Sequence, residues 1–572
     1  MFIHPKSSYM AGRLLLFMSA TTCASHSTIY SDSSTLLVHL TDVHVDPLYV
    51  PGSIAGDGCY CETHESCPRF PVSCTASSDP ATAAGPFGNS DNNCATPPAL
   101  WSSAMSFLES EVPAADASFV FITGDFGEAG LSTACGPPPA PTARQSILDV
   151  ISFGMASART TFPRARVFGV FGNHDTAPGD VFSSSIEMAW LYGPLGSPDG
   201  AFGKDLANDT AALATLSGFG WYTTKLTDQT SLIALNTNYW TSLNPANTGN
   251  ESDAGKLGEA QFEFVSSTLA AIARANRSAV VIGHIPPSAA WLPKLYTRYR
   301  AILTQFPVVL AQYFGHEHLD EFVLVRACTP APPPSNPYSG PWTETTGISW
   351  CSGVNLPVGD VWGQGTVPGS PHCPYVPASN GTAEGRISLC EGVCGNLSDC
   401  QGFTWYPSDG VNGACCFRIN CDEKPPSPNS TAECFEKAAS RECEDPQAPL
   451  HVLYVTPSLT EGYPASNPGL RVFSVDAATL EPRDVFTYWM NITLANAVSA
   501  PDWSLEYSAR NLYCLPDVSA QSWADLVERM RVNGSAEFDA FRRATIKQYH
   551  SLGPCDWACK ADTLSALNGT SE

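Results

Sequence analysis

The amino-acid sequence predicts an α/β fold that is interrupted by a disulfide-rich insertion and followed by a C-terminal helical subdomain. Three observations lead to this prediction. Short apolar, β-branched runs alternate with helical patterns in the first 325 residues, which is typical of α/β proteins. Prolines and cysteines cluster between residues 327 and 447. Helical patterns return at about 495–567, after two further apolar runs.

The N-terminal residues 1–24 predict a signal peptide. Lys6 and Arg13 precede the apolar run Leu14 to Met18, and small residues follow as far as Ala24; a frayed N-terminus is the alternative. Removal of Cys23 would leave 20 of the 21 cysteines, an even number that suits a disulfide framework. Asn-x-Ser/Thr sequences, the acceptors of N-glycosylation, also indicate a protein of the secretory pathway. They begin at Asn208, Asn250, Asn276, Asn380, Asn396, Asn429, Asn491, Asn533 and Asn568. We expect a secreted protein or one of the lysosomal or vacuolar lumen.

Length and charge exclude several classes of protein. The 572 residues are 43% hydrophobic and 15% charged, which indicates a globular chain with more than one module. The formal net charge of −25 argues against a nucleic-acid backbone or an anionic membrane as the main partner. We therefore expect no nucleic-acid-binding module. No later stretch approaches the roughly 18 apolar residues of a membrane span, so we also expect no transmembrane segment. We expect the protein to be a monomer.

The first part of the main domain, residues 35–326, repeats one arrangement, in which an apolar run ends in polar residues. Such runs predict strands buried on both faces, and they cover Ser34 to Leu40, Phe119 to Thr123, Val167 to Phe171, Ala279 to Ile282 and Val308 to Phe314. A helix is predicted between the third and fourth runs, where apolar residues recur at spacings of three and four from Phe262 to Ile272. Open α/β sheets bind ligands at the carboxyl ends of their strands. The polar residues after these runs should therefore share one site.

The chain changes character after Arg326. A proline-rich linker begins at Thr329, and ten cysteines follow between Cys351 and Cys443, a density typical of a small disulfide-bonded module. We therefore predict an insertion over 327–447. The last strands of the main domain are predicted in 448–494, and the helical subdomain in 495–567 ends with Cys555 and Cys559. An earlier cysteine cluster at 56–94 predicts a disulfide-pinned loop, with a zinc knuckle as the alternative.

Seven residues that follow the five apolar runs are candidate metal ligands: Asp42, His44, Asp125, Asn173, His284, His316 and His318. Carboxylate, imidazole and amide oxygen are donors that a borderline divalent cation accepts. Seven donors exceed one tetrahedral shell, so they divide between two cations if one carboxylate bridges, about 3.5–4 Å apart. Each motif alone is often only a turn or a cap. All five in order predict a two-cation phosphate site.

These motifs (Asp-x-His, Gly-Asp, Gly-Asn-His-Asp, Gly-His and Gly-His-x-His) resemble the signature of the calcineurin-like metallophosphoesterases. The resemblance implies a β-sandwich flanked by helices. It also implies that one cation is held by Asp42, His44 and His318, the other by Asn173, His284 and His316, and that Asp125 bridges them. His174 would be a catalytic residue that contacts the phosphate or protonates the leaving group. Asp175 would orient the imidazole of His174.

Longer segments resemble the acid sphingomyelinase-like phosphodiesterases: those beginning at Leu40, Gly283, Phe314, Asn467, Asp502 and Cys555. This resemblance covers roughly 35–326 and 448–567. It implies a secreted or lysosomal glycoprotein with two divalent cations, zinc being the expected metal, that hydrolyses phosphodiesters of sphingomyelin-type lipid head groups or of nucleotides.

One departure and two alternatives accompany this interpretation. The family usually has a histidine where this chain has Ala129, four residues after the bridging aspartate. The alternatives are an endopolyphosphatase-like hydrolase and a catalytically weak scaffold that presents the insertion. Segments at Cys390, Cys400 and Cys415 resemble a PAN/apple module, which implies a glycan or protein ligand. A disulfide-rich spacer is the competing interpretation of the insertion.

Overall fold

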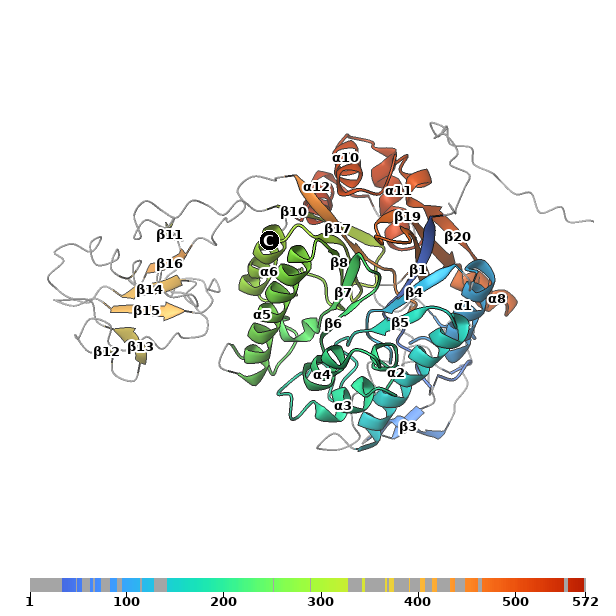
Figure 1. Ribbon diagram of the computed structural model, residues 1–572, viewed down its shortest axis with the longest axis horizontal. Helices are drawn as coiled ribbons and strands as arrows, with labels where there is room; N and C mark the ends of the chain where they lie inside the picture. The colour runs from blue at the N-terminus through green and yellow to red at the C-terminus, as the bar shows by residue number, and fades with distance from the viewer. Residues whose placement is uncertain are drawn as a thin grey trace, which may run out of the picture. The chain divides into compact units, whose positions relative to one another are not determined.

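The protein is described by a computed structural model. Figure 1 shows two compact units: one comprises residues 1–326 with 448–572, and the other residues 327–447. Within them the structure describes residues 33–47, 49–53, 62–64, 67–73, 83–89, 95–113, 116–127, 141–249, 252–288, 290–327, 448–460, 466–549 and 554–569, with short segments between 342 and 437. The predicted signal peptide and most of the 56–94 loop lie outside the described residues.

Two six-stranded mixed sheets form the core of the larger unit. In the first sheet the central strand β1 (Ser34–Leu40) pairs in parallel with β4 (Ala117–Ile122), which pairs in parallel with β5 (Arg166–Gly169). On its other side β1 pairs antiparallel with β18 (Gly469–Asp476). The sheet continues antiparallel through β19 (Pro482–Met490) and β20 (Trp503–Ser508).

The second sheet has the order β10, β17, β9, β8, β7, β6. Its parallel centre consists of β7 (Thr230–Ala234), β8 (Ser278–Ile282), β9 (Val309–Phe314) and β17 (Pro449–Val455). The antiparallel edges are β6 (Tyr222–Lys225) and β10 (Glu321–Arg326).

Aromatic side chains join the inner faces of the two sheets. The Tyr313 ring of β9 lies 5.6 Å from Phe121 of β4 and 5.0 Å from Phe473 of β18, centroid to centroid. Tyr454 of β17 lies 5.0 Å from Phe473. The central strands β4, β8 and β9 are almost wholly buried, as the continuous apolar runs predict. The expected α/β sandwich is confirmed.

Helices cover the outer faces of both sheets (Figure 1). The first sheet is accompanied by α1 (Pro98–Glu111) and α2 (Pro141–Thr161), and the second by α5 (Asp253–Arg274) and α6 (Pro293–Gln305). The predicted helical pattern falls in α5, whose residues Phe262, Val265, Leu269 and Ile272 are all buried. Two shorter helices, α3 (Ala189–Gly196) and α4 (Thr210–Phe219), lie between β5 and β6 in the sequence and pack against each other.

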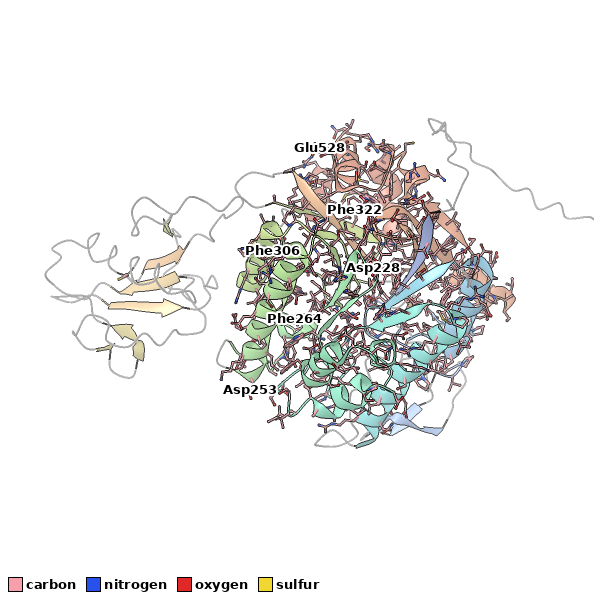
Figure 2. The ribbon with its side chains drawn as sticks, in the orientation of Figure 1. Asp228, Asp253, Phe264, Phe306, Phe322 and Glu528 are labelled. Atoms are coloured by element: carbon pink, nitrogen blue, oxygen red, sulfur yellow. A yellow bond between two sulfur atoms is a disulfide. The ribbon has the colours of Figure 1, made fainter. Side chains whose placement is uncertain are left out.

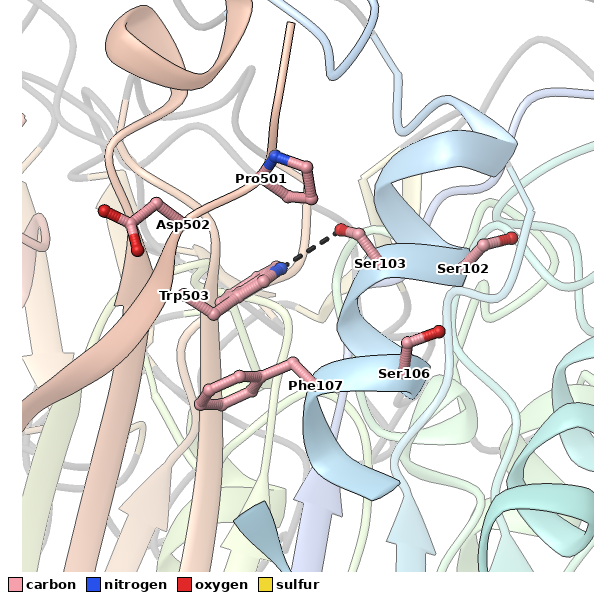
Figure 3. Close-up of a pocket in the computed structure, with 7 residues that line it drawn as sticks. All are labelled: Ser102, Ser103, Ser106, Phe107, Pro501, Asp502 and Trp503. Carbon is pink, nitrogen blue, oxygen red and sulfur yellow. Dashed lines mark hydrogen bonds between the residues drawn. The ribbon is translucent and has the colours of Figure 1, made fainter. Parts of the chain in front are cut away.

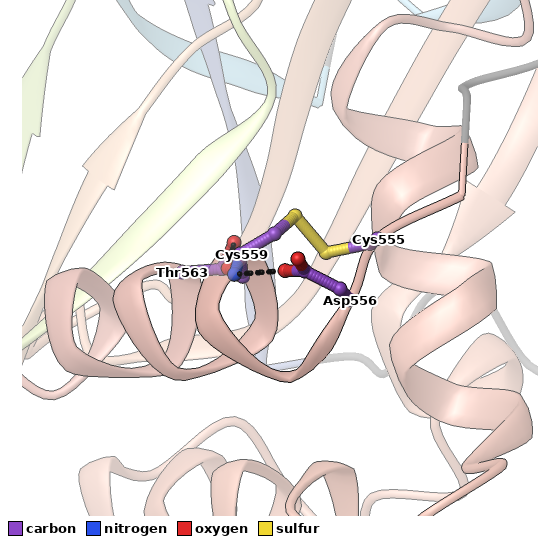
Figure 4. The surroundings of a disulfide bond; sticks show 4 residues. All are labelled: Cys555, Asp556, Cys559 and Thr563. Atoms are coloured by element: carbon purple, nitrogen blue, oxygen red, sulfur yellow. Dashed lines mark hydrogen bonds between the residues drawn. A yellow bond between two sulfur atoms is a disulfide. The ribbon is translucent and has the colours of Figure 1, made fainter.

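Five helices are described in the C-terminal region. They are α8 (Ile492–Val498), α9 (Ala509–Leu512), α10 (Ala520–Met530), α11 (Ala536–Thr545) and α12 (Trp557–Leu567). Phe322 of β10, labelled in Figure 2, lies 4.2 Å from the Trp523 ring of α10 and 5.9 Å from Phe541 of α11. Cys555 and Cys559 form a disulfide at the start of α12, where Asp556 caps the helix (Figure 4).

The smaller unit contains a four-stranded antiparallel sheet of order β11, β16, β14, β15. These strands are β11 (Trp342–Glu344), β14 (Gly402–Tyr406), β15 (Ala414–Arg418) and β16 (Glu433–Lys437). A separate two-stranded antiparallel sheet consists of β12 (Thr366–Val367) and β13 (Ser370–Pro374). The cysteine pairing and any ligand surface of a PAN/apple module lie outside the described residues and stay predictions.

Candidate metal centre

The seven predicted ligands come together where β1, β4, β5, β8 and β9 end. Each ligand follows its strand within a few residues, so the parallel strands deliver the ligands to one edge of the sandwich. The backbone there is unusual, because left-handed φ angles between 44° and 72° occur at Asp42, His44, Asp125, His316 and His318. Such conformations cost about 1–3 kcal/mol each for non-glycine residues and cluster at functional sites.

The first donor group consists of Asp42, His44 and His318. Asp42 Oδ1 lies 3.2 Å from His318 Nε2 and 4.0 Å from His44 Nε2. The two imidazole nitrogens lie 3.3 Å apart. The other carboxylate oxygen, Asp42 Oδ2, accepts hydrogen bonds from the Thr41 hydroxyl at 2.8 Å and from the His316 amide at 2.8 Å. This holds Oδ1 toward the two imidazoles.

The second donor group consists of Asp125, His284 and His316, and the Asn173 amide joins it. Asn173 Oδ1 lies 3.0 Å from His284 Nε2 and 3.1 Å from His316 Nδ1. His284 Nδ1 lies 2.7 Å from the carbonyl oxygen of Thr123 and donates to it. This hydrogen bond leaves the lone pair of Nε2 directed at the centre of the group.

The Asp125 carboxylate lies between the two groups. Its Oδ2 is 3.5 Å from His44 Nε2 of the first group and 3.2 Å from His284 Nε2 of the second. Its Oδ1 accepts a hydrogen bond from the His174 amide at 2.9 Å. One carboxylate oxygen therefore faces both donor groups, which is the position that a bridging ligand requires.

Asp175 does something other than what the sequence suggested. Its carboxylate accepts three backbone hydrogen bonds, from Gly172 at 2.7 Å and from Asp125 and Phe126 at 2.9 Å each. Among the described residues none joins it to the imidazole of His174. The expectation that Asp175 orients this ring is therefore corrected: Asp175 is committed to fixing the backbone on both sides of the bridging carboxylate, because three amides converge on its two oxygens.

His174 lies at the border of the site. Its ring centroid is 5.5 Å from that of His44 and the two ring planes are inclined at 62°. His174 is partly exposed, whereas most of the predicted ligands are buried. The residue is therefore accessible to a substrate that approaches from solvent. The position suits a group that contacts the substrate rather than a metal ligand.

The geometry of both groups fits a cation. Metal–ligand bonds of about 2.0–2.1 Å in a tetrahedron place neighbouring donor atoms about 3.3 Å apart, and most of the distances above are 3.0–3.5 Å. Asp42 Oδ1 is buried and accepts no hydrogen bond from the described residues. A buried carboxylate oxygen without a donor is costly, and a cation at this point would satisfy it.

Electrostatics keep two of the imidazoles neutral and favour positive charge at a third. Burial lowers the pKa of His44 to about 3 and the pKa of His316 to about 4, so both imidazoles are neutral. Burial would also lower the pKa of His284, but the Asp125 carboxylate outweighs it and raises this pKa to about 10. Burial, reinforced by the Asp125 charge, raises the pKa of Asp175 to about 7. The field of Asp125 therefore favours positive charge at this point, whether a proton or a cation.

The C-terminal region braces the loop that carries His316 and His318. The buried Lys547 ammonium donates to the carbonyl oxygen of His318 at 3.2 Å. The amide of Asp320, two residues further on, donates to the carbonyl oxygen of Thr545. Because Thr545, at the end of α11, and Lys547 both hydrogen-bond this loop, this part of the C-terminal region supports the candidate metal site.

Comparisons with known proteins agree with this geometry. Residues 35–320, half of the chain, match the calcineurin-like phosphoesterase family. The chain belongs to this family. Residues 448–569 of this phosphoesterase match the acid sphingomyelin phosphodiesterase C-terminal region, so the braced loop and its brace both fall within matched segments.

The curated relatives are phosphodiesterases. The phosphoesterase is 23% identical over 561 residues to the acid sphingomyelinase-like phosphodiesterase 3b of Homo sapiens, covering 92% of this chain and 86% of the relative. It is 22% identical to a cyclic GMP-AMP phosphodiesterase of Homo sapiens, with the same coverage. It is also 22% identical to sphingomyelin phosphodiesterase B of Dictyostelium discoideum, covering 93% of this chain and 63% of the relative. The chain is thus a phosphodiesterase-like hydrolase of the calcineurin-like phosphoesterase family, with two groups of candidate metal ligands.

The structure brings all seven predicted ligands together, and their roles as ligands stay predictions. Ala129 lies outside the described residues. Three residues that sequence reasoning missed are Thr41, Asp180 and Lys547, which hold ligands by hydrogen bonds. Of these three, only Thr41 could have been recognised from the sequence, because it directly precedes the predicted ligand Asp42.

A groove that lies away from the candidate metal centre is not lined by a cluster of metal-ligating side chains. It has a volume of about 470 Å³ and lies between α1 and the start of β20 (Figure 3). The Trp503 indole lines the groove and donates a hydrogen bond to the Ser103 hydroxyl at 3.0 Å. Asp502 is the one titratable side chain in its lining, so it offers no cation site.

Proposed function

We propose that the protein is a phosphodiesterase that uses two zinc ions to hydrolyse phosphodiesters of lipid head groups or nucleotides in a secretory or lysosomal compartment. The observation that carries the proposal is the position of Asp125 Oδ2, which faces an imidazole nitrogen of each donor group. The names of the relatives support the substrate classes, and the oxygen and imidazole donors suit zinc.

Each residue of the centre has a distinct task in this proposal. Asp42, His44 and His318 would hold one cation, Asn173, His284 and His316 the other, and Asp125 both. The chemistry that two cations supply, when bound, is neutralisation of phosphate charge and a lowered pKa for the attacking water. His174 lies beside the first group, where its imidazole can hydrogen-bond a phosphate oxygen and pass a proton to the leaving oxygen.

The remaining polar groups keep these donors still. The Thr41 hydroxyl and the His316 amide fix the Asp42 carboxylate, and Asp175 fixes the backbone of Asp125. A site that is organised before substrate arrives loses no free energy to rearrangement during the reaction. The left-handed backbone at five ligands supports this interpretation, because the surrounding structure must hold each strained residue in place.

The experiment compares wild type with Asp125→Asn. Wild type, loaded with zinc, should hydrolyse bis(4-nitrophenyl) phosphate, sphingomyelin or a dinucleotide well above 4-nitrophenyl phosphate, because a diester is the proposed substrate. Asp125→Asn should fold, bind fewer than two ions and hydrolyse none of them, since a neutral amide bridges two cations poorly. Full activity of Asp125→Asn with two ions bound would refute the proposal.

A further inference from the structure

The ligand Asn173 poses a problem of orientation that the carboxylate ligands Asp42 and Asp125 do not. An amide side chain has an oxygen end and a nitrogen end of nearly equal shape, and only the oxygen has lone pairs for a cation. Rotation by 180° exchanges the two ends. In the structure the oxygen faces the centre, 3.0 Å from His284 Nε2 and 3.1 Å from His316 Nδ1. Something in the fold must select this orientation.

The nitrogen end of the amide contacts a carboxylate. Asn173 Nδ2 donates to Asp180 Oδ1 at 2.8 Å, and the Asp180 amide donates back to the Asn173 carbonyl oxygen at 2.8 Å. An ionised carboxylate can only accept hydrogen bonds. If the amide were flipped, its oxygen would face Asp180 Oδ1 with no hydrogen between them, and its N–H groups would face the cation position.

We propose that Asp180 is a positioning residue that fixes the Asn173 amide with its oxygen toward the second cation. The inference rests on the proposed two-cation function, and it adds a residue outside the ligand set. The hydrogen bond is charge-assisted, which makes it stronger than one between neutral groups. It also polarises the amide and so makes the ligating oxygen a better donor, as acceptors behind metal ligands do.

The backbone at Asp180 explains which residues can fill this position. Its φ angle is +63°, a left-handed conformation that glycine adopts freely and that asparagine and aspartate tolerate best among the other residues. Aspartate combines tolerance of this turn with an acceptor that is never a donor when ionised. Asparagine would keep an acceptor oxygen without the charge, and glycine would keep the turn without any acceptor. The two substitutions therefore separate hydrogen bonding from backbone geometry.

The test measures zinc binding by competition with a chromogenic chelator. Loss of a hydrogen-bonding partner behind a ligand typically weakens metal affinity about 10–100-fold. We expect Asp180→Gly to weaken one of the two binding steps by about this factor and to change the other less than about threefold. Asp180→Asn should recover most of the loss. The visible spectrum of the cobalt-substituted protein should change at one site in Asp180→Gly and stay near that of wild type in Asp180→Asn.

A matched control isolates the effect of the added glycine. Ser499 also has a left-handed φ, +53°, on the exposed end of α8, and Ser499→Gly should bind both ions as wild type does. Asp180→Ser, whose acceptor is too short, should repeat the loss seen with glycine. Melting temperatures of the zinc-free proteins confirm folding.

Two results would overturn the inference: wild-type affinity at both steps in Asp180→Gly, or a loss in Asp180→Asn as large as that in Asp180→Gly. A wild type that binds fewer than two ions would refute the proposed function instead, so the two failures are distinguishable.

Discussion

Replacing Arg471 by methionine should destabilise the protein far more than the same replacement at Arg483. Arg471 on β18 is 1% exposed. Its guanidinium forms an ion pair with Asp320 and donates to the Val455 carbonyl oxygen at 3.0 Å. Arg483 on β19 pairs with Asp476, and their side chains are 40% and 23% exposed. The two arginines therefore make the same type of contact in different surroundings.

The difference in burial sets the expected magnitudes. Arg471→Met would leave the Asp320 carboxylate buried with the Tyr507 hydroxyl as its side-chain donor among the described residues. Removing one partner of a buried ion pair costs about 3–5 kcal/mol, because an uncompensated charge remains. An exposed pair contributes about 0–1 kcal/mol. With an unfolding entropy of about 2.1 cal/mol/K per residue over roughly 400 residues, the melting temperature should fall roughly 4–6 °C in Arg471→Met.

Differential scanning calorimetry of the zinc-free proteins measures both changes. Arg483→Met should shift the melting temperature by less than about 1 °C. A double variant, Arg471→Met with Asp320→Asn, should regain part of the loss, because it removes the unpaired charge as well. Equal shifts in the two single variants, or no recovery in the double variant, would refute this reasoning.

Three further predictions concern the site and the insertion. Gly315→Ala should abolish zinc binding and lower the melting temperature, since a Cβ there would lie 2.5 Å from a carboxylate oxygen of the first donor group; Gly218→Ala, with open space around it, should bind zinc normally. His174→Ala should bind two zinc ions yet hydrolyse diesters about 10²–10⁴-fold more slowly, and reduced zinc content would contradict its placement outside the ligand set. Replacing residues 327–448 by an Asn-Gly turn should leave zinc binding and hydrolysis of small diesters intact, because Arg326 and Pro449 are paired in adjacent antiparallel strands; a folded but inactive protein would show that the insertion contributes to the site.

The sequence was sufficient to predict the five strands that precede the candidate ligands, because both signals are local. Ala279 to Ile282 is a continuous apolar run and His284 follows it, so neither the strand nor its candidate ligand depends on distant residues for recognition. The order of five such segments then indicated one shared edge. The shared edge could be predicted because the carboxyl ends of parallel strands lie at the same edge of a sheet.

Contacts between distant segments could not be predicted in the same way. Lys547 reaches the carbonyl of His318 across 229 residues of sequence, and nothing near position 547 marks it as a partner of the metal loop. Asp175 was assigned to the wrong neighbour because sequence shows its adjacency to His174 and not the three amides that converge on it. Left-handed backbone at the ligands was equally invisible, since only the surrounding packing imposes it.

The central claim is that hydrolysis needs two cations bridged by Asp125. The most direct test titrates chelated wild-type protein with zinc and records bound ions per chain together with the rate of bis(4-nitrophenyl) phosphate hydrolysis. The account predicts little hydrolysis at one ion per chain and a rate that rises until two ions are bound. Full activity with one ion, or with none, would contradict it.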